Sequence, residues 1–111
     1  MTESMIANAE SILLYRMRDA YVSRNQSALF HILHGLARAY WSNGFAEAAA
    51  ENLAFLLLQD DLPPDLRESA EELLADIEGR VCPRIILDAR TFAAEMDLQG
   101  MVEYLLEDNV N

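Results

Sequence analysis

The sequence predicts an all-α fold of about six helices that pack as antiparallel hairpins. Apolar residues recur about every three to four positions along nearly the whole chain, and no segment alternates long enough to indicate a strand. Proline and glycine stand between the periodic segments. The chain has 111 residues, of which 52% are hydrophobic, so we expect a single domain with one core over residues 1–111.

The first two helices are expected over residues 2–22 and 26–42, separated by a polar break at 23–25. The N-terminal helix, in residues 1–22, carries an apolar stripe that consists of Ile6, Ala9, Leu13, Met17 and Ala20. The inward residues of the second helix are Leu29, Ile32, Leu33, Leu36, Ala37 and Tyr40. Gly44 follows where a left-handed helix cap favours a residue without a side chain, so we predict a structural turn there.

The third helix, about residues 45–59, is apolar over most of its circumference and should be the central, most buried helix. Pro63 and Pro64 are the next predicted turn residues: Pro63 ends this helix and Pro64 suits the first turn of the fourth. The fourth helix, to about Glu78, has apolar residues on one face and acidic residues on the other.

Two further helices are expected in the region 80–107. Pro83 opens the fifth helix, which extends to about Glu95, and Asp97 is a suitable N-cap for a sixth helix over residues 98–106. Residues 108–111 are polar and are expected to form a frayed tail.

Residues 33–58 resemble one helical hairpin of a tetratricopeptide repeat (TPR). The residues that carry the resemblance are Leu33, Leu36, Ala37, Tyr40, Asn43, Gly44, Phe45, Ala48, Ala49, Leu53 and Leu56. In this resemblance the small residues allow close helix approach and the aromatic residues fill the gap between repeats. At a shift of 33 residues, Leu33 and Ala37 correspond to Leu66 and Ala70, as expected for a repeat of about 34 residues.

From about Val22 onward, the chain also resembles the C-terminal repeat and cap region of large bacterial signalling ATPases and LuxR-type transcriptional regulators. The segments concerned are 36–40, 43–49, 63–65, 70–75 and 92–106. This resemblance implies a TPR-like right-handed superhelix, with a hairpin and following helix over 23–79 and capping helices over 80–107. It also implies a scaffold or adaptor that binds proteins, including in signalling or transcriptional regulation.

Composition excludes several classes of function. The net charge is −11, with three acids and four arginines in residues 1–43 (+1) and sixteen acids and four arginines in 44–111 (−12). An acidic chain disfavours nucleic acid, and a chain without lysine has no phosphate-binding loop of the usual kind. Cys82 is the sole cysteine. We expect no cofactor, no metal, no membrane span and a cytoplasmic location.

These observations predict a non-catalytic protein–protein interaction module that binds a protein or peptide. The concave face of such hairpins is lined by the first helix of each repeat, so the candidate binding residues are Asn25, His31, His34, Arg38 and Trp41. Trp41 is an interface anchor or a core residue. His31 and His34 would form a metal pair only if a carboxylate converged on them, and their structural interpretation is favoured.

The expected partners include a second copy of the chain, because an array of about one and a half repeats exposes apolar ends that a homodimer would cover. A small acidic helical chaperone for a secreted or aggregation-prone partner is the alternative function. An enzyme is the remote alternative. The sequence shows no catalytic triad, and Asp60 and Asp61 are better explained as solvated residues that end a helix.

Overall fold

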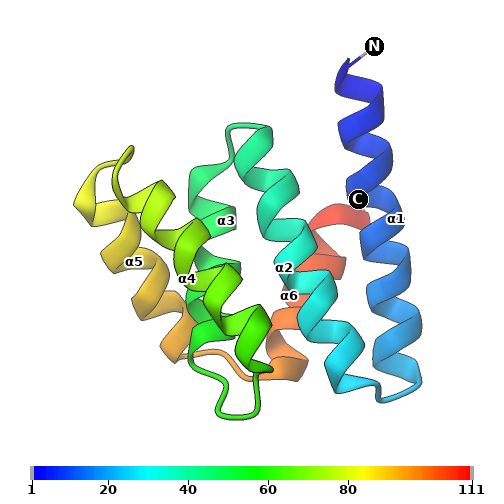
Figure 1. The fold of residues 1–111 in the computed structure, drawn as a ribbon. Helices are drawn as coiled ribbons and strands as arrows, with labels where there is room; N and C mark the ends of the chain where they lie inside the picture. Colours follow the sequence, from blue (N-terminus) through cyan, green and yellow to red (C-terminus); the bar gives the residue numbers. More distant parts are fainter. Residues whose placement is uncertain (1, 111) are drawn as a thin grey trace.

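A computed structural model describes the backbone of residues 2–110 and the side chains of residues 11–106. This part of the chain forms six helices and contains no strand, which confirms the predicted all-α class (Figure 1). The helices are α1 (Thr2–Val22), α2 (Gln26–Ser42), α3 (Ala46–Leu57), α4 (Pro64–Glu78), α5 (Pro83–Ala94) and α6 (Leu98–Val110).

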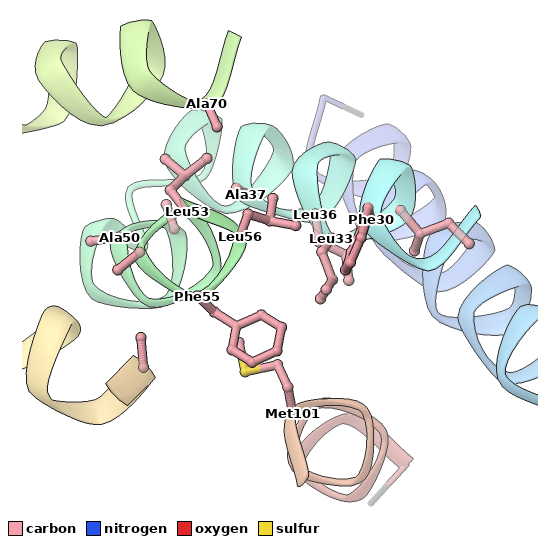
Figure 2. Close-up of a cluster of buried hydrophobic side chains, with 14 of the residues drawn as sticks. Phe30, Leu33, Leu36, Ala37, Ala50, Leu53, Phe55, Leu56, Ala70 and Met101 are labelled. Carbon is pink, nitrogen blue, oxygen red and sulfur yellow. The ribbon is translucent and has the colours of Figure 1, made fainter. Parts of the chain in front are cut away.

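The core is organised around α3, which packs against α2, α4 and α5. Seven of its twelve residues are buried, as its nearly continuous apolar sequence predicts. Figure 2 shows Phe55 of α3 pointing toward Met101 of α6, and both side chains are 0% exposed. The inward residues predicted for α2 are all buried. Met17 and Ala20 of the α1 stripe are buried and Leu13 is partly buried, whereas the side chains of Ile6 and Ala9 lie outside the described residues.

The first and last helices of the chain are in contact. α6 packs against α1, on the opposite side of the core from α4 and α5 (Figure 1). In an open array of stacked repeats each unit contacts only its neighbours. The contact between α1 and α6 differs from that pattern.

The turn between α2 and α3 depends on Gly44. Its φ of +83° lies in the left-handed region, as predicted from the glycine. The amide of Phe45 then donates to the carbonyl of Tyr40 at 2.8 Å. Phe45 becomes the N-cap residue of α3, so the helix begins at Ala46, one residue later than predicted.

The connection between α3 and α4 is stabilised by a side chain that the helix prediction did not include. Arg67 of α4 donates from Nη1 to the carbonyl of Leu57 at 3.1 Å and from Nη2 to the carbonyl of Gln59. A cation at these carbonyls also interacts favourably with the negative end of the α3 dipole. α3 therefore ends at Leu57, before Pro63, and Pro64 occupies the first turn of α4 as predicted.

At the C-terminal end, α5 stops at Ala94 and α6 continues to Val110. The backbone is thus helical beyond residue 106, where the sequence predicted the last helix to end. Of the predicted tail, Asn111 lies outside the described residues.

Candidate functional site

Two of the predicted binding residues, His34 and Arg38, lie in a small polar cleft between α2 and α4. The cleft has a volume of about 310 Å³. Its lining consists of His34, Arg38, Ser69, Glu72, Leu73 and Asp76. Ser69 Oγ lies 3.0 Å from His34 Nε2, which joins the two helices through a hydrogen bond. One arginine and two carboxylates thus share this surface, so the arginine offsets only one of the two negative charges.

The electrostatics of His34 argue against a serine–histidine catalytic pair. Burial lowers the pKa of His34, and the positive charges of Arg38 and then His31 lower it further. A histidine that acts as general base for a serine must become an imidazolium, which an adjacent carboxylate normally stabilises. Here the neighbouring charges that shift the pKa are cationic. The surroundings of His34 thus disfavour the imidazolium form, and its contact with Ser69 links α2 to α4.

The other predicted binding residues are spread along α2. Asn25 is the N-cap, and its Oδ1 accepts a hydrogen bond from the amide of Ala28 at 3.1 Å. His31 is exposed, and Trp41 is half-buried and packs against the core. At about 1.5 Å per residue, Asn25 and Trp41 are about 24 Å apart along the helix. These five residues therefore do not form one compact site.

A larger groove, about 620 Å³ in volume, lies where α3, α5 and α6 meet the turn after α2. We call it the apolar groove because its lining is rich in aromatic, aliphatic and small residues. The lining residues are Tyr40, Gly44, Phe45, Ala46, Glu47, Ala48, Glu51, Ile85, Tyr104 and Leu105.

Each element contributes to the groove for a local reason. The left-handed turn at Gly44 places Phe45 outside the helix, where its side chain is 57% exposed. Glu51 lies on the same side of the first turns of α3 as Glu47 and Ala48, because it is four and three residues from them. On the opposite side, the ring of Tyr104 contacts that of Phe92 of α5, with the ring centroids 5.0 Å apart and the ring planes tilted by 56°. This contact orients the Tyr104 ring at the groove.

This groove was not predicted from the sequence. The aromatic residues of the hairpin were expected to fill the gap between repeats, whereas Phe45 is more than half exposed in this chain. The sequence signal for this exposure is the position of Phe45 directly after a glycine expected to be left-handed, which separates Phe45 from the apolar stripe of α3. Ile85 and Tyr104 come from helices whose neighbours the sequence does not specify.

Within the described residues, no group of three histidine, cysteine or acidic side chains is arranged to hold a metal ion. None of the helices in this part of the chain is long and apolar enough to cross a membrane. Comparisons with protein-family models, curated proteins and solved structures found no match. The resemblance to tetratricopeptide repeats thus stays a prediction from the sequence.

Proposed function

We propose that this chain is a non-catalytic protein-interaction module of TPR-like helical hairpins, and that it receives a segment of a partner protein in the apolar groove. The observation that carries the proposal is the combination of a 620 Å³ groove with the exposed aromatic ring of Phe45 beside it. Binding sites are typically concave and largely apolar, with a few polar groups that orient the ligand.

Exposure of Phe45 is costly for an isolated chain. A fully buried phenylalanine gains about 1.5–3 kcal/mol relative to an exposed one. A partner side chain that packs against Phe45, Ile85 and Tyr104 would recover part of this free energy. Aromatic residues also dominate the energetics of protein interfaces. The groove therefore supports recognition of an apolar anchor residue on a short segment.

Selection from a displayed library of random peptides tests the proposal. We expect enriched peptides to contain an apolar anchor and to bind Phe45→Ala about tenfold or more weakly, since interface anchors contribute about 2 kcal/mol or more. Leu58→Ala is the matched control, because Leu58 is 56% exposed but lies outside the groove lining. The proposal fails if no peptide is enriched, or if Phe45→Ala and Leu58→Ala bind equally well. A general chaperone would instead select many unrelated apolar peptides that are insensitive to Phe45.

We further propose that the chain forms the homodimer expected from its sequence, and that the outer face of α1 contacts the second copy. Ile12, Tyr15 and Val22 on this helix are 52%, 77% and 75% exposed. Light scattering over a concentration range should show a dimer for the wild type and a monomer for Tyr15→Lys. Leu87→Lys, on the exposed side of α5, is the control and should stay dimeric. A wild-type monomer at high concentration would refute the dimer.

A further inference from the structure

The helix α1 is apolar on its outer side as well as on its inner side. Met17 and Ala20 are buried against the core. Ile12, Tyr15 and Val22 are each more than half exposed, and at about 3.6 residues per turn they lie within about 80° of one another, opposite the buried pair. Figure 1 shows α1 at the edge of the molecule. A helix that is apolar on both sides is typically covered on both sides.

Charged residues accompany this outer face of α1. Asp19 lies near its middle, between Ile12 and Tyr15 around the helix, whereas Arg16 and Arg18 lie at its two opposite edges. All three charged side chains are exposed, and no ion pair or side-chain hydrogen bond joins them to another described residue. They are thus available to groups on another molecule.

A second copy of the chain can meet this face in two orientations, and a two-fold dimer repeats every contact. If the two α1 helices are parallel, equivalent residues lie at the same height, so Asp19 of one copy opposes Asp19 of the other. The same symmetry places the Arg16 edge of each copy beside the Arg18 edge of the other. Parallel packing therefore brings like charges together, which is unfavourable.

Antiparallel packing brings opposite charges together instead. When the helices cross at the level of Met17, Arg16 of one copy and Asp19 of the other lie on the same edge of the contact, about 1.5 Å apart in height. Ile12 of one copy then lies level with Val22 of the other. Both apolar ends of the outer face are covered in this arrangement.

We infer that a second copy of this chain packs its α1 antiparallel against the first, with Arg16 of each copy paired to Asp19 of the other. This inference rests on the proposed homodimer and specifies the orientation and the ion pairs of its interface. The outer face is self-complementary in this orientation, because the same symmetry matches its apolar ends and its charges. A second copy therefore satisfies both kinds of group together.

Charge reversal tests the inference by sedimentation equilibrium at low salt. Arg16→Asp and Asp19→Arg should each weaken the homodimer about fivefold or more, because each replaces two symmetry-related ion pairs with like-charge contacts, and high salt should reduce both effects. Arg18→Asp is the matched control. It makes the same change of net charge as Arg16→Asp on the same exposed helix, but it lies at the opposite edge. It should leave the dissociation constant within about twofold of the wild type.

A mixture of the two weakened variants separates contacts between copies from contacts within one chain. Each variant has like charges at positions 16 and 19, so the loss of a pair within one chain would persist in the mixture. In an antiparallel heterodimer of Arg16→Asp with Asp19→Arg, every acid at these positions faces an arginine of the other copy. We expect the mixture to dimerise about fivefold or more tightly than either variant alone.

The outcomes separate the orientation from the dimer itself. If Tyr15→Lys breaks the dimer but Arg16→Asp weakens it no more than Arg18→Asp does, or tightens it, the antiparallel pairing is refuted and the α1 interface stands. Failure of the mixture to recover also refutes the pairing. A wild-type monomer, or a dimer that Tyr15→Lys leaves intact, refutes both proposals. Weakening by both reversals, with recovery in the mixture, supports the inference.

Discussion

Asn52 is a polar side chain that the core accommodates poorly, and its replacement should not weaken the fold. It is 1% exposed on α3, where Nδ2 donates to the carbonyl of Leu33 at 3.3 Å. Its Oδ1 has no hydrogen-bond partner among the described residues. The long hydrogen bond stabilises the fold by about 0.5–1.5 kcal/mol, whereas an unpaired buried carbonyl costs about 1–3 kcal/mol. Removing both groups should therefore gain about 1 kcal/mol.

The variant Asn52→Leu keeps the branched shape of the side chain and adds apolar contacts. We expect it to raise the free energy of unfolding by about 1 kcal/mol, which is about 4 °C in Tm for a domain of this size. Asn52→Ala adds no volume to the core, and we expect it to leave the free energy of unfolding nearly unchanged. Truncation of an ordinary core residue, such as a buried leucine, to alanine would by comparison cost about 2–5 kcal/mol.

Urea unfolding followed by circular dichroism measures both variants against the wild type. If both lose more than about 1 kcal/mol, Oδ1 of Asn52 makes a stabilising hydrogen bond in solution and the reasoning is refuted.

Three further predictions concern the helices and their turns. Because burial and nearby positive charge lower the pKa of His34, the unfolded chain binds more protons than the folded chain below about pH 6.5. Stability measured by urea unfolding at each pH should therefore fall as the pH drops through that window, and it should fall less in His34→Gln. Gly44→Ala should cost about 1–2 kcal/mol because of its φ of +83°, whereas Gly79→Ala, with a φ of −71°, should be neutral or stabilising; equal thermal melts for the two would contradict this account. Leu53→Ala should cost about 2–5 kcal/mol, since Leu53 is 0% exposed, and a loss below about 1 kcal/mol would show that the core around α3 is loose.

The helices were largely predictable because strong local signals mark their ends. The predicted bounds of α1, α2 and α4 agree with the structure, where a polar break, a left-handed Gly44 and the pair Pro63–Pro64 separate them. The end of α3 was predicted two residues too late: the chain leaves the helix after Leu57, where Arg67 of the next helix binds the carbonyls of Leu57 and Gln59. A long side chain that reaches back to the backbone leaves no periodic signal in the sequence.

The candidate site was predictable only where it lies on one helix. His34 and Arg38 were predicted as binding residues on the face of α2 that would line the concave side of the hairpins, and α4 completes the cleft that they line. The apolar groove requires instead that Ile85 and Tyr104 meet the first turns of α3. Hydrophobic patterning indicates that α5 and α6 bury one face, but it does not specify which helix covers that face.

The central position of α3 links the stability of this chain to its proposed function. The helix buries its apolar residues against α2, α4 and α5, and the face of its first two turns that carries Glu47 and Glu51 borders the apolar groove. Variants of buried residues such as Phe55 would therefore disturb the groove and the fold together, and loss of binding in such variants would be ambiguous. Phe45 lacks this problem because its side chain is 57% exposed and is not part of the core. Binding that depends on Phe45 while the unfolding transition stays unchanged would assign recognition to the groove itself.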